Sequence, residues 1–253
     1  MSEREYCYCF IKYSHDIKFD VIGMGGSSNV YTVRYRDIAA VVSDSRQGEY
    51  EVSKENVTCH ESVLSTVLKD FTVLPVGFGC VARDIDQIKE KVIKPNYNQL
   101  HQLLEEMDGK IELALKALWK DNQILQQEVL KADPVIKKRW DKLISSRKKD
   151  FCQAIPLSNK LGKRLVSAID GIKECYRDRL LVPLDEIALD KRLKKIYHAL
   201  MIFNIAFLVN RDKEGEFDTA IDKLDQEYGK DIKFMYTGPL APYSFVDLYI
   251  GLE

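Results

Sequence analysis

The sequence lacks the long apolar run that a membrane-spanning helix requires. Its longest apolar stretch, residues 199–209, has 11 residues and is interrupted by Asn204, whereas a helix that crosses a bilayer needs about 20. Residues 1–5 are mostly polar or charged and predict no secretory signal peptide. We therefore expect a cytoplasmic protein that does not enter a membrane.

The sequence also has no excess of charge of one sign. It carries 38 basic and 39 acidic residues, which gives a net charge of -1 and no general attraction to nucleic acid or to an anionic membrane. Its six cysteines form no CxxC pair. Because 45% of the 253 residues are hydrophobic, the chain can build a core without disulfide bonds, and we expect reduced thiols.

Common catalytic and cofactor-binding motifs are missing as well. Residues 23–28 are rich in glycine and serine, but they lack the Lys-Ser/Thr ending of a phosphate-binding loop and precede a predicted strand. His60 and Glu61 resemble the start of an HExxH zinc motif, but Leu64 stands where the second histidine belongs. We expect no catalytic residue, metal, cofactor or small-molecule substrate. A small enzyme that uses His60 with Glu61 is kept as an alternative.

What is present is a strand-rich N-terminal part. Aromatic residues, alternation and apolar runs predict strands at residues 6–12, 29–35, 38–42 and 71–81. Helical spacing after Ser53 and after Asp84 predicts helices, the second interrupted by Pro95. We interpret residues 1–108 as a ferredoxin-like α+β domain, with helices on one face of its sheet and the other face free.

The C-terminal part predicts a second α+β domain, residues 109–253. Residues 109–119 alternate like a strand, although many of them favour helices. Helices are expected at 121–131, 134–149, 157–180 and 217–228, and strands at 197–209 and 232–237. We interpret this part as a modified ferredoxin-like domain with a helical insertion at about 120–182.

A basic run within residues 131–149 is a candidate contact surface. It includes Lys137, Lys138 and Arg139, with few acidic residues between its cations, so it suits an acidic protein partner. Nucleic acid is a second possibility, but Trp140 is the only aromatic residue of the run and base stacking has little support. A solvated helix face is the simplest alternative.

Aromatic residues crowd the first predicted strand. Regular alternation places Tyr8 and Phe10 on one face, while Cys7 and Cys9 share the other. Tyr6, Tyr8 and Phe10 are candidates for a partner-binding surface if that face is free. Core packing explains the same residues equally well.

Three segments match the pattern of a known family. They are Ile38 to Asp44 (IAAVVSD), His60-Glu61 with Val73 to Gly79 (VLPVGFG), and Tyr236 to Phe245 (YTGPLAPYSF). In these segments the chain resembles the gas vesicle protein F/L family, and the resemblance spans residue 6 to about 250. The chain departs from the family pattern at Gly77, Leu240 and Ala241, where arginine, tryptophan and proline are usual.

The resemblance implies a non-enzymatic, cytoplasmic accessory protein that supports the nucleation and assembly of gas vesicles. Implied partners are the small hydrophobic shell subunit and other gas vesicle accessory proteins, and no catalytic residues carry over. A folded partner would shield the apolar surface of the shell subunit before assembly. Tyr243 and Phe245 are expected to anchor the C-terminal turn on the core, and we also count them as candidate partner-binding residues.

Overall fold

The computed structural model describes residues 4–27, 29–144 and 160–246, which form two sheets with helices. The chain folds into two compact units. Unit 1 takes in the chain up to Leu113, then Leu208–Asp212 and the chain from Gly238; unit 2 takes in Ala114–Phe207 and Lys213–Thr237. None of the described helices is long and apolar enough to span a membrane.

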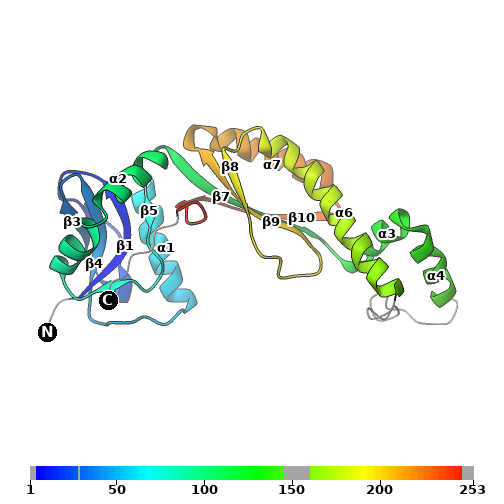
Figure 1. Ribbon diagram of the computed structural model, residues 1–253, viewed down its shortest axis with the longest axis horizontal. Coiled ribbons are helices and arrows are strands. Elements are labelled where there is room, and N and C mark those ends of the chain that lie inside the picture. The colour runs from blue at the N-terminus through cyan, green and yellow to red at the C-terminus, as the bar shows by residue number, and fades with distance from the viewer. Residues whose placement is uncertain (1–3, 28, 145–159, 247–253) are drawn as a thin grey trace. The chain divides into compact units, whose positions relative to one another are not determined.

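The sheet of unit 1 is built around its first strand. Its order is β2-β3-β4-β1-β5, and β6 also pairs with β1 (Figure 1). Pairing between β1 and β4 and between β3 and β4 is antiparallel. The strands are β1 Arg4–Lys12, β2 Lys18–Phe19, β3 Val30–Tyr35, β4 Ile38–Ser45, β5 Leu74–Pro75 and β6 Val81–Ala82. The predicted hairpin is therefore confirmed, with Arg36 at its turn in a left-handed conformation (φ 56°).

Helices cover both faces of this sheet, so the predicted free face is wrong. Helix α1 (Lys54–Leu68) belongs to one apolar cluster, whereas the π-helix η2 (Gln87–Ile93) and helix α2 (Tyr97–Glu106) belong to another. Strand β4 contributes alternate residues to the two clusters. Its continuous apolar run, Ile38–Val42, already indicates a strand that is buried on both sides.

A β-bulge changes which residues of β1 share a face. Cys7 pairs with Val42 and Cys9 with Val41, which leaves Tyr8 as an extra residue in the ladder. Cys7 and Phe10 therefore pack in one cluster, and Tyr8 and Cys9 in the other. The predicted sharing of faces by Tyr8 and Phe10, and by Cys7 and Cys9, is wrong because it assumed unbroken alternation.

The sheet of unit 2 has the order β10-β7-β9-β8, and the boundary between the units falls within its three long strands. The three long strands are β7 Lys110–Trp119, β9 Met201–Asn210 and β10 Ile232–Leu240, and the short fourth strand is β8 Asp190–Leu193. The prediction of a strand at 109–119 is confirmed. Strand β8 was not predicted, because its four residues, DKRL, are all exposed and lack an apolar pattern.

Unit 2 contains four described helices, and two of them begin at a capping aspartate. The four helices are α3 Asn122–Ala132, α4 Pro134–Ile144, α6 Lys160–Asp185 and α7 Glu214–Tyr228. Asp121 accepts hydrogen bonds from two amides at the start of α3, and Asp133 does the same for α4. Asp133 also pairs with Arg164 of α6 at 2.6 Å. Part of the helix predicted at 134–149, and the start of the one predicted at 157–180, lie outside the described residues.

Candidate functional site

The second and third motif segments meet around a buried histidine in unit 1. His60 lies on α1 and is only 1% exposed. Its Nδ1 lies 3.0 Å from the hydroxyl of Tyr6, and its Nε2 lies 2.7 Å from the hydroxyl of Tyr243. The Tyr6 hydroxyl also accepts a bond from the Gly79 amide, and the Tyr243 hydroxyl donates to the Val76 carbonyl.

These contacts select one tautomer of His60. If Nε2 carries the proton, it donates to Tyr243, whose own proton remains available for Val76. Tyr6 then donates to Nδ1 and accepts from Gly79. The opposite tautomer makes both tyrosines redirect their protons and leaves Tyr6 with no acceptor in these contacts. We therefore assign the proton to Nε2.

Burial also fixes the charge of His60. Desolvation lowers its pKa to about 4, with the Val76 backbone opposing this shift. The pKa of the neighbouring Glu61 is raised, first by burial and then by the carboxylate of Glu112. A neutral histidine with both nitrogens engaged is a structural bridge, and at 1% exposure it offers no room for a substrate.

The C-terminal segment is attached to unit 1 by further contacts. Both the amide and the hydroxyl of Ser244 donate to Glu112, at 2.7 and 2.6 Å. Ala241 is buried in the cluster that contains Tyr6, and Phe245 packs against the opposite cluster. The predicted role of Tyr243 and Phe245 as anchors of the C-terminal turn agrees with these contacts.

The tyrosines of β1 also have internal partners. The hydroxyl of Tyr8 accepts a bond from the Met24 amide at 2.6 Å and bonds to Ser43 at 2.8 Å. A β-carbon on Gly23 would meet this hydroxyl at 2.9 Å, so close packing explains the glycine at this position, whereas Gly25 and Gly26 have positive φ angles. Tyr6, Tyr8 and Phe10 are at most 1% exposed. The face that would have exposed them is not free, and core packing, the alternative kept from the sequence, explains them, so we do not include them in a partner-binding surface.

The predicted basic residues lie together on one helix of unit 2. Ile136 and Trp140 lie on the buried side of α4, while Lys137, Lys138 and Arg139 are exposed. In the part of the chain that the structure describes, these three cations form no ion pair with a carboxylate. Their binding of an acidic protein partner stays a prediction.

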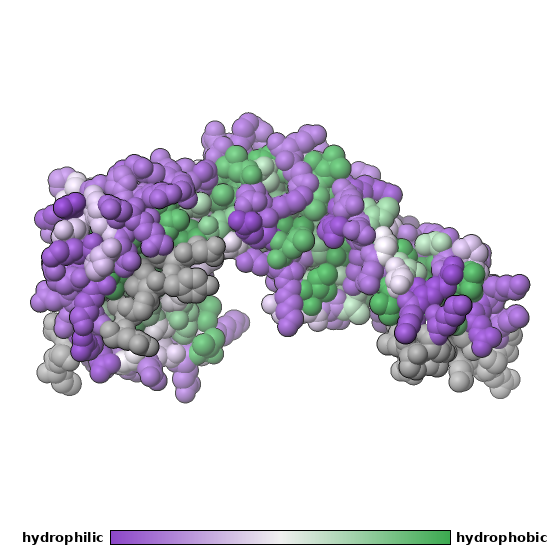
Figure 2. Space-filling view, in the orientation of Figure 1, coloured by the Kyte–Doolittle hydropathy of each residue, from purple (hydrophilic) through white to green (hydrophobic). Residues whose placement is uncertain are grey.

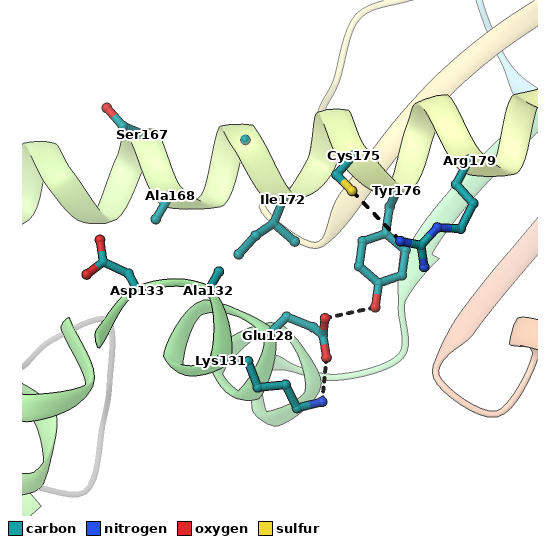
Figure 3. Close-up of a pocket in the computed structure, with 11 residues that line it drawn as sticks. Glu128, Lys131, Ala132, Asp133, Ser167, Ala168, Ile172, Cys175, Tyr176 and Arg179 are labelled. Carbon is teal, nitrogen blue, oxygen red and sulfur yellow. Dashed lines mark hydrogen bonds and ion pairs between the residues drawn. The ribbon is translucent and has the colours of Figure 1, made fainter. Parts of the chain in front are cut away.

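A groove of about 540 Å³ lies between α3 and α6 (Figure 3). Small residues, among them Ala132, Ala168 and Gly171, line part of it. Several of its polar groups are already paired: Glu128 accepts bonds from Lys131 at 2.8 Å and from Tyr176 at 2.9 Å. The groove therefore has few polar groups that await a ligand.

Apolar side chains are exposed beside the edge strand β8. They are Leu189 (51%), Leu193 (67%), Ile196 (47%) and Tyr197 (72%). Figure 2 shows apolar residues, in green, at the surface over the sheet of unit 2. Sequence reasoning missed this surface, because it lies in a short segment where lysines and arginine separate the apolar residues.

No group of three or more histidine, cysteine, aspartate or glutamate side chains suited to a metal ion occurs within residues 4–27, 29–144 and 160–246. Cys7 and Cys9 are buried and free, and burial raises the pKa of each thiol. Both thiols therefore stay protonated and poorly nucleophilic at neutral pH.

Comparisons with known proteins agree on both fold and family. Two crystal structures of gas vesicle protein GvpF share the fold: that of Microcystis aeruginosa has a TM-score of 0.78 at 24% identity and that of Anabaena has a TM-score of 0.80 at 21%. Each alignment covers at least 97% of this chain and at least 99% of the other. Gas vesicle protein F of Haloferax mediterranei is 28% identical over 256 residues, covering 100% of this chain and 98% of the relative.

The chain, with its two sheets and helices, thus has the fold of the solved gas vesicle proteins. Residues 5–247 match the model of the family described as gas vesicle synthesis protein GvpL/GvpF. The chain belongs to this family, which gives it an accessory role in gas vesicles.

Proposed function

We propose that this accessory protein binds the hydrophobic shell subunit in the cytoplasm and supports the nucleation and assembly of vesicles. The observation that carries the proposal is the apolar surface beside β8, which we define as Leu189, Leu193, Ile196 and Tyr197. A cluster of large exposed apolar side chains in so short a segment is typical of protein interaction sites. Other accessory proteins would bind elsewhere on the chain.

The position of this surface favours an apolar partner. Strand β8 ends the order of its sheet among the described strands, so one side of its backbone has no strand neighbour there. Natural proteins protect such edges with charged residues, and Asp190, Lys191 and Arg192 serve that purpose in β8. The apolar residues that flank them provide burial for a partner, while the charges disfavour pairing between copies of this chain.

The size of the effect follows from burial. Covering one large apolar side chain contributes about 1.5–3 kcal/mol. Leu193 and Tyr197 are already partly covered, so we expect about 3 kcal/mol from the two together, or roughly a hundredfold in affinity. Because this contribution does not depend on charge, it should persist at high salt.

The test is capture of co-expressed shell subunit by the full chain at low and high salt. We expect Leu193→Ser combined with Tyr197→Ser to abolish capture at both salt concentrations. The matched control combines Ile22→Ser with Val52→Ser, which removes two apolar side chains of unit 1 that are 67% and 83% exposed. Equal capture by the two double variants would refute this surface. Capture that disappears at high salt would instead indicate a charged contact.

We further propose that the chain is not an enzyme. The alternative of an enzyme depended on His60 with Glu61, and His60 is buried, neutral and bonded to two tyrosines. The alternative of nucleic-acid binding depended on α4, whose one aromatic residue, Trp140, is 4% exposed. The apolar surface beside β8 therefore supports the binding proposal more strongly than any observation supports either alternative.

A further inference from the structure

The exposed side of α4 carries a concentration of positive charge that the rest of the described chain does not neutralise. Lys137, Lys138 and Arg139 are consecutive and exposed, and they form no ion pair within residues 4–27, 29–144 and 160–246. Like charges held this close repel one another, so an anionic partner would relieve the repulsion. The net charge of the whole chain is only -1, so an attraction for anions at this helix is a local property and not one of the whole chain.

A hollow with both basic and apolar lining lies at these cations. It measures about 340 Å³ and is lined by Val135, Lys138, Arg139, Lys142 and Leu161. Val135 is 52% exposed and Leu161 is half-buried, so one wall of the hollow is apolar while its rim is basic. A second hollow of about 420 Å³, which shares Lys138 with the first, is lined by basic residues, Pro134 and Asp141.

We propose that this face of α4 binds an acidic protein segment that also carries an apolar side chain. Carboxylates of the segment would pair with Lys138 and Arg139, and the apolar side chain would enter the hollow between Val135 and Leu161. This contact is separate from the apolar surface beside β8 and does not depend on binding of the shell subunit. It provides the chain with a second partner of different chemistry.

The same features disfavour nucleic acid. Sequence-tolerant binding of single strands uses aromatic side chains on which bases stack. Trp140 is the one aromatic residue of α4 and its side chain is 4% exposed. Phosphates would use the cations but leave the hollow beside Val135 empty.

The experiment measures binding of fluorescent probes to the full chain at low salt by anisotropy. The probes are a peptide in which pairs of glutamates alternate with leucine, polyglutamate of equal charge, and oligothymidylate of equal charge. We expect the leucine-containing peptide to bind best. Lys138→Gln combined with Arg139→Gln should weaken binding of this peptide about tenfold. The matched control, Arg46→Gln with Lys54→Gln, should leave the affinity for the peptide unchanged.

A second variant tests the hollow. Val135→Ser should weaken binding of the leucine-containing peptide several-fold and leave binding of polyglutamate unaffected. The control is Val52→Ser, which changes a valine that is 83% exposed. All these positions are exposed, so the variants should keep the circular dichroism spectrum of the original chain. The proposal is overturned if no peptide binds at low salt, if the α4 variants bind like their controls, or if oligothymidylate binds more tightly than the peptide.

Discussion

Acidification below the ordinary pKa of histidine should destabilise unit 1 through His60. In the unfolded chain this side chain takes up a proton near pH 6.5, but burial lowers its pKa in the folded chain to about 4. Between these values the unfolded state holds more protons, so the free energy of unfolding decreases as the pH falls. The stability that the neutral His60 contributes to the folded chain is fully present above pH 6.5 and is lost below about pH 4.

The expected loss follows from the two pKa values. Each pKa unit corresponds to about 1.4 kcal/mol, so the shift from 6.5 to about 4 gives a loss of about 3 kcal/mol. Glu61 contributes with the opposite sign, because burial raises the pKa of its carboxyl and favours the protonated form. The effect of His60 must therefore be separated from that of Glu61 and of the other carboxylates.

Comparison with His60→Gln makes this separation. Urea unfolding of both proteins would be measured from about pH 8 to about pH 4. Far-UV circular dichroism is the appropriate signal, since both tryptophans, Trp119 and Trp140, lie in unit 2. Glutamine does not titrate, so the difference in unfolding free energy should shrink by about 3 kcal/mol across this range. A constant difference would refute a buried, neutral His60.

Other predictions concern the contacts of unit 1 and are tested by urea unfolding at neutral pH. Tyr243→Phe removes the hydroxyl that accepts from Nε2 of His60 at 2.7 Å and should cost about 1–3 kcal/mol; no loss would contradict a stabilising role of this contact. Ser244→Ala removes one bond to Glu112 and should cost about 1.5 kcal/mol, and an unchanged midpoint would show that the amide bond suffices. Gly23→Ala places a β-carbon 2.8 Å from another in β4 and should cost about 1–3 kcal/mol; normal stability would mean that the segment shifts freely.

Strongly patterned elements could be predicted from the sequence. The alternation of 29–35, the apolar run of 38–42 and the alternation of 109–119 each correspond to an observed strand. Ser53 begins α1, where its side chain accepts a bond from the Asn56 amide. Such features depend on residues close together in the chain, so local rules are sufficient. The division at residue 108 and the ferredoxin-like description of both domains stay predictions.

Features set by distant residues could not be predicted. The bulge at Tyr8 depends on pairing with β4, and no local signal distinguishes it from regular alternation. The contact of His60 with Tyr243 joins residues separated by 183 positions. Strand β8 exists because β9 lies beside it, although its own residues are charged and exposed. These are cases in which tertiary structure overrides local preference.

The motif segments and the proposed binding surfaces therefore serve different purposes. His60, Tyr243 and Ser244 hold the C-terminal segment on unit 1 and are engaged by internal partners. The surfaces beside β8 and on α4 lie in unit 2, and few internal contacts constrain their exposed side chains. Changes at the motif residues should accordingly reduce stability and partner binding together, because binding requires the folded chain. Changes in the surface beside β8 or on α4 should reduce binding alone, and a loss of stability there would contradict this division.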